Sequence, residues 1–176
     1  MVVPASPKLI VFAGLPGVGK STIARRVSES LDAVWLRVDT IEASLLKAGV
    51  PRSFETGLAA YIAAQDIASE HLELGRSVVI DAVNGVEPAR QMWRDLASRW
   101  RATLTVVEVT CKDRTEHRRR VETRSSATPP VPSPTWDEVV AREYLPWREP
   151  VLSVDGSEPV ERNVELIVHH LRSGRE

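Results

Sequence analysis

The chain has 176 residues, with 23 lysines and arginines against 24 aspartates and glutamates, so its formal net charge is −1. This length suits one domain over residues 1–176 with a sizeable core, and the balanced charge disfavours a domain that grips nucleic acid mainly through its phosphates. One cysteine excludes an internal disulfide framework, and no apolar run approaches the length of a membrane span. We expect a cytoplasmic protein, a monomer or homodimer, without contact with a membrane.

A glycine-rich loop follows the first apolar stretch. Residues 8–12 read as a short strand, residues 14–21 read Gly-Leu-Pro-Gly-Val-Gly-Lys-Ser, and residues 22–31 have helical spacing. Strand, loop and helix therefore follow in the order of a phosphate-binding loop (P-loop) with the pattern G-x-x-x-x-G-K-S. The residues predicted to bind the nucleotide are Gly14, Leu15, Pro16, Gly17, Val18, Gly19, Lys20, Ser21 and Thr22.

The residue types in this loop suit a triphosphate. Glycines are needed where a Cβ would collide with the phosphates, and the loop amides together with the start of the next helix form an anion site. Lys20 adds a positive charge near the β- and γ-phosphates, and Ser21 offers a hydroxyl to Mg²⁺. ATP and Mg²⁺ are therefore the predicted cofactors.

The next elements alternate in type. Residues 33–38 form a second predicted strand that ends at Asp39, and residues 40–48 a helix. A long helix is predicted over residues 57–74, with an apolar side made of Leu58, Ile62, Ile67, Ala68 and Leu72.

The third strand, residues 77–80, is continuously apolar and ends at Asp81. A helix opened by Pro88 follows, with Trp93 and Trp100 expected in the core, and residues 103–110 form the fourth strand.

Residues 112–124 carry six basic against three acidic residues, and residues 125–134 hold four prolines without a periodic pattern. We predict that residues 112–134 form a short lid with a loop. Residues 136–147 are predicted to be helical up to an interruption at Pro146, residues 151–154 a fifth strand, and Pro159 opens a last helix.

This alternation predicts an α/β fold with a five-stranded parallel sheet between two helical layers. Ligands of such folds collect at the carboxyl ends of the strands. The P-loop, Asp39, Asp81 and residues 118–124 all follow strand ends, so we expect them along one edge of the sheet.

Two aspartates are candidates for chemistry. Asp39 is the predicted catalytic base for an acceptor hydroxyl; the alternative is a helix N-cap, and the two are compatible. Asp81 is predicted to hold the metal through water or to line the acceptor pocket; the alternative is a turn residue that supports Asn84 and Gly85.

Arginines of the lid are the predicted clamp for the transferring phosphate. Arg120 and Arg124 share a helix face, and guanidinium groups stabilise the charge that a phosphoryl group spreads over its oxygens. The alternative is a solvated basic helix face. Trp136 and Trp147 could stack on the base, but core burial under the last helix is the favoured interpretation.

Several segments together resemble a known family. Residues 38–43 (Val-Asp-Thr-Ile-Glu-Ala) resemble the segment with the catalytic carboxylate in chloramphenicol phosphotransferase, and residues 79–84 resemble a third-strand signature D-x-x-N. Residues 111–124 and 134–136 are similar to the lid helix and the motif after it. The chain thus resembles small P-loop kinases of the AAA-family and zeta-toxin-like type, related to gluconate kinase, adenylylsulfate kinase and polynucleotide kinase.

The resemblance implies an adenylate-kinase-like fold and a lid whose arginines, including Arg118, contact ATP. Polynucleotide kinases have an arginine three residues after the catalytic aspartate, where this chain has Glu42. We therefore predict a kinase that moves the γ-phosphate of ATP to a hydroxyl of a small molecule. The alternatives are a kinase for a nucleotide or polynucleotide 5′-hydroxyl, and an ATPase switch with water as acceptor.

Overall fold

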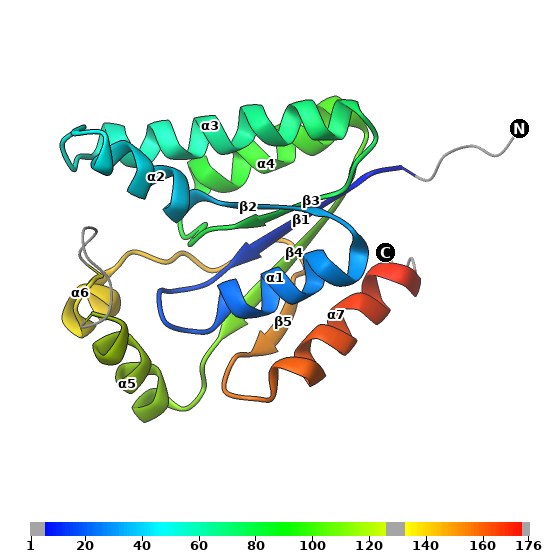
Figure 1. The fold of residues 1–176 in the computed structure, drawn as a ribbon. Coiled ribbons are helices and arrows are strands. Elements are labelled where there is room, and N and C mark those ends of the chain that lie inside the picture. Colours follow the sequence, from blue (N-terminus) through cyan, green and yellow to red (C-terminus); the bar gives the residue numbers. More distant parts are fainter. Residues whose placement is uncertain (1–5, 126–132, 174–176) are drawn as a thin grey trace, which may run out of the picture.

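The computed structural model describes residues 6–125 and 133–173, which form one sheet with helices on both faces (Figure 1). All strand pairs are parallel, and the strand order is β2-β3-β1-β4-β5. The strands are β1 (Lys8–Ala13), β2 (Val34–Arg37), β3 (Val78–Asp81), β4 (Thr103–Thr110) and β5 (Leu152–Asp155). The predicted fold class is confirmed.

Two apolar clusters, one on each face of the sheet, form the core. Side chains alternate along a strand, so Leu9 and Val11 of β1 pack toward one face while Ile10 and Phe12 pack toward the other. The helices α3 (Phe54–Glu73) and α4 (Glu87–Trp100) cover the first face, and α1 (Lys20–Leu31) and α7 (Val160–Ser173) the second (Figure 1). A strand buried on both faces explains why the β1 sequence is continuously apolar.

Three further helices lie near the carboxyl ends of the strands (Figure 1). They are α2 (Val38–Lys47), α5 (Arg114–Ser125) and α6 (Trp136–Ala141). The predicted proline-rich loop falls largely on residues 126–132, which lie outside the described residues. Within the described ranges, no helix combines the length and the apolarity needed to cross a membrane.

The long helix α3 buries a different face from the predicted one. Leu58, Ile62 and Ile67 are 41%, 44% and 38% exposed. The buried residues of α3 are Thr56, Ala60, Ala64, Ala68 and Leu72. Small alanines let the helix approach the sheet and α4 closely, and the larger apolar side chains remain at the surface. The prediction for this face was therefore wrong for Leu58, Ile62 and Ile67.

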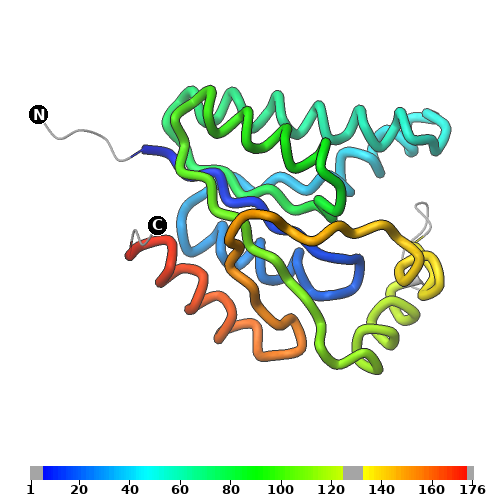
Figure 2. Tube along the Cα trace, turned by 180° about the vertical axis from the view of Figure 1, so that it is seen from behind, coloured from blue at the N-terminus to red at the C-terminus, as the bar shows by residue number. Residues whose placement is uncertain are grey.

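Two element boundaries also differ from the prediction. The second strand ends at Arg37, so Asp39 lies in the first turn of α2 and is not its N-cap, which is Arg37. The helix after the lid ends at Ala141 rather than 147, since Arg142 has extended backbone angles. Residues 142–151 then run without regular structure across the sheet toward β5 (Figure 2).

Candidate active site

The P-loop is held in a backbone conformation that requires glycine. Gly14 has a φ of +138°, and a Cβ there would lie 2.2 Å from the carbonyl oxygen of Val109 on β4. Gly17 has a φ of +84°, and its Cβ would lie 2.5 Å from Cγ2 of Val121 on α5. Protein neighbours, and not only a bound phosphate, therefore exclude side chains at these positions.

Lys20 lies across the loop that precedes it. Its side chain is buried, and Nζ donates a hydrogen bond to the carbonyl oxygen of Leu15 at 3.0 Å. Burial lowers the pKa of Lys20, while the carboxylates of Asp81 and Asp39 act in the opposite direction. The lysine thus faces both of the predicted functional carboxylates.

Asp81 ends β3 directly beside the P-loop strand. It is 3% exposed, and its Oδ2 has no hydrogen-bond partner among the described residues, although Nε of Arg37 lies 3.4 Å away. Burial raises the pKa of Asp81, and the charge of Lys20, hydrogen bonding from the Ser21 side chain and the charge of Arg37 lower it. A buried carboxylate with an unused oxygen therefore lies beside the loop serine.

These residues fit Mg²⁺. Mg²⁺ takes oxygen ligands, retains several waters, and is usually bound through one or two carboxylates together with substrate phosphates. Ser21 and Asp81 supply a hydroxyl and a carboxylate oxygen next to the place where the loop would hold phosphates. No group of three or more His, Cys, Asp or Glu that could hold a metal occurs in the described part of the chain.

Asp39 is exposed in the first turn of α2. Its charge acts on Lys20, Asp81 and Tyr61, so it lies within electrostatic reach of the loop and of helix α3. Burial raises the pKa of Tyr61 to about 12. An exposed carboxylate thus lies near the P-loop at this edge of the sheet.

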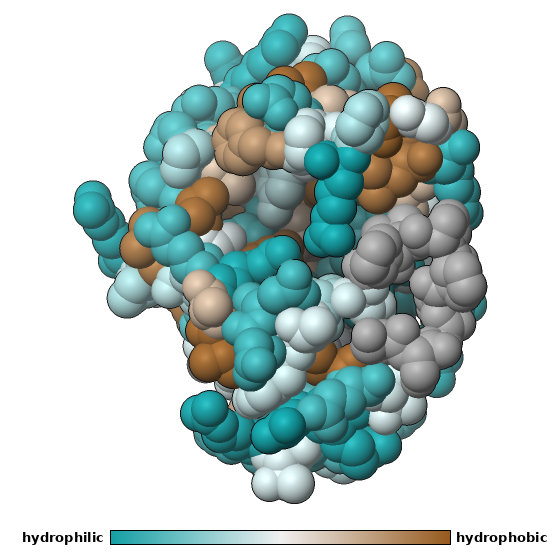
Figure 3. All heavy atoms as spheres, turned by 90° about the vertical axis from the view of Figure 1, so that its left-hand side faces the viewer, coloured by the Kyte–Doolittle hydropathy of each residue, from teal (hydrophilic) through white to brown (hydrophobic). Residues whose placement is uncertain are grey.

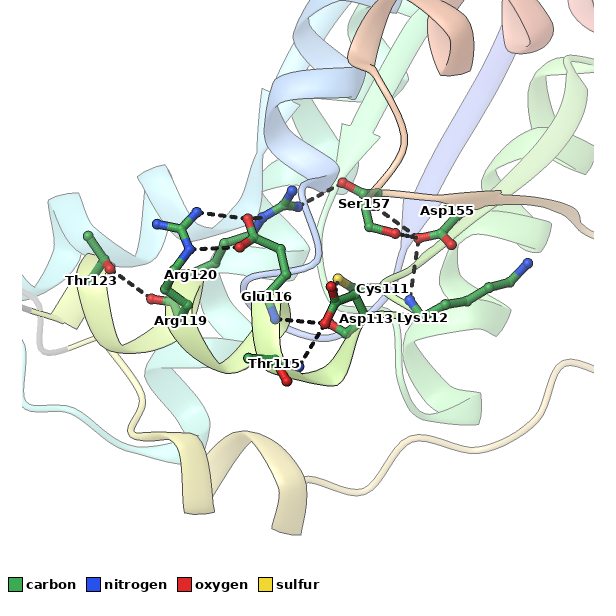
Figure 4. A network of polar contacts seen from close by, with 11 residues as sticks. Cys111, Lys112, Asp113, Thr115, Glu116, Arg119, Arg120, Thr123, Asp155 and Ser157 are labelled. Atoms are coloured by element: carbon green, nitrogen blue, oxygen red, sulfur yellow. Dashed lines mark hydrogen bonds and ion pairs between the residues drawn. The ribbon is translucent and has the colours of Figure 1, made fainter.

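Helix α5 is docked on the P-loop. Nε2 of His117 lies 2.8 Å from the carbonyl oxygen of Pro16. Arg120 donates from Nε to a carboxylate oxygen of Glu116 and from Nη1 to the carbonyl oxygen of Gly156, both at 2.7 Å (Figure 4). Gly156 follows β5 and approaches Val18 so closely that a Cβ there would lie 1.8 Å from the Val18 carbonyl oxygen. Arg120 thus links the lid to the loop that flanks the P-loop.

The other predicted lid residues are placed differently. The charge of Arg124, an exposed residue, acts on Lys20, so this arginine lies within electrostatic reach of the P-loop. Arg119 pairs with Glu116 (Figure 4) and Arg118 with Glu122, and both side chains are more than half exposed, at 64% and 60%. The structure therefore brings Arg120 to the loop and Arg124 within electrostatic reach of it, and it does not bring Arg118 there.

Two arginines that were not predicted from the sequence also lie in this site or within electrostatic reach of it. Arg37 approaches Asp81, and the charge of Arg142 acts on both Lys20 and Tyr61. Arg37 occupies a strand end beside Asp39, which was a usable signal. Nothing in the sequence around Arg142 related it to the P-loop, because residues 136–147 were predicted to be helical. The two tryptophans after the lid pack on polar neighbours: Trp136 on His117, and Trp147 on Arg90.

Seen from the carboxyl ends of the strands, the surface is hollowed near its centre, with both hydrophilic and hydrophobic residues around the hollow (Figure 3). The sheet order places β1 in the middle and the P-loop at its end, between the loops that follow β3 and β4. Open α/β sheets bind ligands in such a position.

Comparisons with known proteins agree with this geometry. The model of an AAA domain family, AAA_33, matches residues 9–146. The chain is 32% identical over 77 residues to the shikimate kinase of Clostridium beijerinckii, which covers 44% of this chain and 46% of that enzyme. The chain thus spans less than half the length of that curated relative.

Solved structures cover the whole fold. The Mycobacterium tuberculosis APS kinase CysC, solved in complex with AMPPNP and APS, superposes with a TM-score of 0.72 at 18% identity over 96% of this chain and 99% of that chain. Chaetomium thermophilum Kti12, solved in complex with ADP-AlF3, gives a TM-score of 0.71 at 20% identity over 94% and 97%. The chain therefore belongs to this AAA domain family and has the fold of P-loop kinases.

Proposed function

We propose that this protein is an ATP- and Mg²⁺-dependent phosphotransferase that transfers the γ-phosphate to a hydroxyl of a small molecule. The observation that carries the proposal is the buried Asp81 carboxylate, whose free oxygen lies beside Ser21 and Lys20, with the exposed Asp39 within electrostatic reach. This arrangement supports binding of the metal and the phosphates and a role for Asp39 as the base.

The residues divide the work as follows. The P-loop amides and Lys20 hold the phosphates. Ser21 and Asp81 would hold Mg²⁺, which would neutralise negative charge on the phosphates. Asp39 accepts the proton of the acceptor hydroxyl as the hydroxyl oxygen attacks the γ-phosphorus. The bond to the bridging oxygen breaks, and ADP leaves. Arg120 and Arg124 stabilise the charge on the transferring group.

The relatives support a small acceptor. Shikimate kinase and APS kinase carry small molecules in their names, and the APS kinase structure holds both a nucleotide analogue and APS. Glu42, on α2 one turn after Asp39, disfavours a polynucleotide acceptor because a carboxylate repels phosphates. Arg118 remains a predicted nucleotide contact that would need a different lid position.

The decisive experiment measures ATP consumption with Mg²⁺, alone and with a panel of sugars, aminocyclitols, phenicol-like alcohols, hydroxy acids, nucleosides and a 5′-hydroxyl oligonucleotide. We expect turnover that depends on a small hydroxylated acceptor. Asp39→Asn should retain ATP affinity and lose at least about a hundredfold in turnover, the size of a general-base effect. Glu42→Gln removes a carboxylate one turn along the same helix and should keep most of the activity.

Steady hydrolysis that needs no acceptor and is insensitive to Asp39→Asn would replace the kinase proposal with an ATPase switch. Turnover only with the oligonucleotide would instead establish a polynucleotide kinase.

A further inference from the structure

A buried arginine lies behind the active site. Arg90 of α4 is 2% exposed and forms no ion pair with any described residue. Its guanidinium lies 3.8 Å from the ring centroid of Trp147. It donates to four carbonyl oxygens, those of Asn84 (3.0 Å), Gly85 (3.4 Å), Leu145 and Pro146 (2.9 Å). A buried cation is costly without such partners, and only a planar fork can reach several of them at once.

The first two carbonyls belong to the loop that follows Asp81. This loop is fixed to the P-loop strand, because Nδ2 of Asn84 donates to the Phe12 carbonyl oxygen at 2.7 Å and the Gly14 amide donates to the Val83 carbonyl oxygen at 3.1 Å. Asn84 is fully buried, with a left-handed φ of 50°. The loop behind Asp81 and the entry to the P-loop are thus one hydrogen-bonded unit.

The other two carbonyls belong to residues 142–147, which connect helix α6 to the rest of the chain and are called the lid foot below. The Leu145 amide donates to the Gly85 carbonyl oxygen at 2.8 Å, and a Cβ on Gly85 would lie 2.9 Å from the Glu143 carbonyl oxygen. The Tyr144 hydroxyl donates to a carboxylate oxygen of Glu108 on β4 at 2.9 Å. The lid foot is therefore packed backbone to backbone on the loop behind Asp81.

The lid foot has no helix or strand of its own, and helix α6 ends immediately before it. Two of the four carbonyl contacts of Arg90, those with Leu145 and Pro146, give this segment partners that a regular element would otherwise supply.

We propose that Arg90 is a positioning residue that fixes the lid foot to the loop behind Asp81, and thereby keeps that loop, Asp81 and the entry to the P-loop in the geometry that phosphoryl transfer requires. This role rests on the proposed phosphotransferase function. All four carbonyls that Arg90 binds come from the two segments that meet at the site, whereas a purely space-filling role would need only an apolar side chain between α4 and Trp147.

The test compares Arg90→Lys, which keeps the charge but loses the fork, with Arg94→Lys one turn along α4. Arg94 forms ion pairs with Glu87 and Glu149 and is 24% exposed, so it makes a matched control at the edge of the same helix. The readouts are hydrogen exchange of the Leu145 amide, with the amides of α7 as an internal reference, and kcat and KM for ATP per folded molecule.

In Arg90→Lys we expect exchange at Leu145 to accelerate at least about tenfold and kcat to fall at least about tenfold, with KM for ATP changed less than about threefold. Arg94→Lys should change each quantity less than about twofold. Gly85→Ala leaves Arg90 intact but forces the Glu143 carbonyl away, and it should reproduce both effects. This variant replaces Arg90→Lys in the test if Arg90→Lys does not fold.

The proposal would be overturned if Arg90→Lys changed neither the hydrogen exchange of the Leu145 amide nor kcat per folded molecule. The same holds if the variant only lost thermal stability. If no acceptor, including water, supports turnover in the wild-type protein, the proposed function fails. Exchange at Leu145 still decides whether Arg90 holds the lid foot.

Discussion

Buried charges meet beneath the P-loop at a cost to the folded state. Oδ2 of Asp81 and Nε of Arg37 form an ion pair at 3.4 Å, but neither buried atom has a hydrogen-bond partner in the described structure. A buried polar atom left unpaired costs about 1–3 kcal/mol. A binding site can keep such an atom where a ligand supplies the missing partner. A metal ion would supply it for Asp81.

The pH dependence of stability tests the state of Asp81. Its pKa is raised by burial above the ordinary value of 3.8. As the pH rises above that value, the unfolded chain releases a proton that the folded chain still holds, so this carboxyl lowers stability progressively. Asp81→Asn cannot ionise. We therefore expect its melting temperature to rise relative to wild type as the pH increases from about 4 to about 7 without nucleotide.

Thermal unfolding followed by circular dichroism measures this difference, with Asp66→Asn at an exposed position of α3 as the control. A melting-temperature difference for Asp81→Asn that stays constant over this pH range would show that the buried carboxyl titrates normally.

Gly17 and Gly49 have similar left-handed backbone angles but different neighbours. Alanine substitutions at the two positions therefore distinguish backbone strain from a clash at the P-loop. Gly17 and Gly49 have φ values of +84° and +91°, but a Cβ on Gly17 would meet Val121 at 2.5 Å and one on Gly49 would meet nothing within 4 Å. Both alanine variants should lose about 1 kcal/mol of stability from the left-handed backbone. Only Gly17→Ala should also lose the rise in melting temperature caused by ATP and Mg²⁺, measured by differential scanning fluorimetry. Equal stabilisation by the nucleotide in both variants would contradict the docking of α5 on the loop.

Among the helices, α3 shows why apolar periodicity can mislead. Its larger apolar residues recur at helical spacing, yet the alanines form the buried face, because the space between α3, α4 and the sheet admits only small side chains. The spacing of apolar residues identifies a helix. When two faces of the helix are apolar, the distance to the neighbouring elements decides which face is buried.

On α3, adding a larger apolar side chain at a buried position should therefore destabilise the protein more than removing an apolar side chain from an exposed position. Ala64→Leu inserts volume into a fully buried position and should lower the free energy of unfolding by about 1–3 kcal/mol. Ile62→Gln, at a position 44% exposed, should change it by less than about 0.5 kcal/mol. Urea denaturation gives both values, and a larger loss in Ile62→Gln would restore the face predicted from the sequence.

The P-loop and Asp81 could be predicted because their signals are local: a fixed pattern of residues, and a carboxylate at the end of an apolar strand. The lid foot could not. Residues 142–147 are held by Arg90 and Gly85, which lie more than fifty positions earlier, and nothing in their own composition shows that contact. The same reason hid Arg142, because a helical interpretation of the segment gave it no relation to the P-loop.

Across the fold, the class and the strand count followed from alternation of apolar strands and amphipathic helices. The order β2-β3-β1-β4-β5 did not, because it depends on which face each connecting helix covers, and that choice is made by contacts distant in sequence. The position of the site depends on this order, since it puts the ends of β3 and β4 on either side of the P-loop.

The central place of β1 also governs how the chain acquires its structure during synthesis. β1 pairs with β3 and β4, and β2 pairs with β3, so the first two strands made are not neighbours. The nascent chain cannot form any sheet hydrogen bond until residues 78–81 have left the ribosome, and β1 stays open on one edge until residues 103–110 follow. Premature termination before residue 103 would therefore release an apolar strand with one unpaired edge, which is a substrate for chaperones and a seed for aggregation.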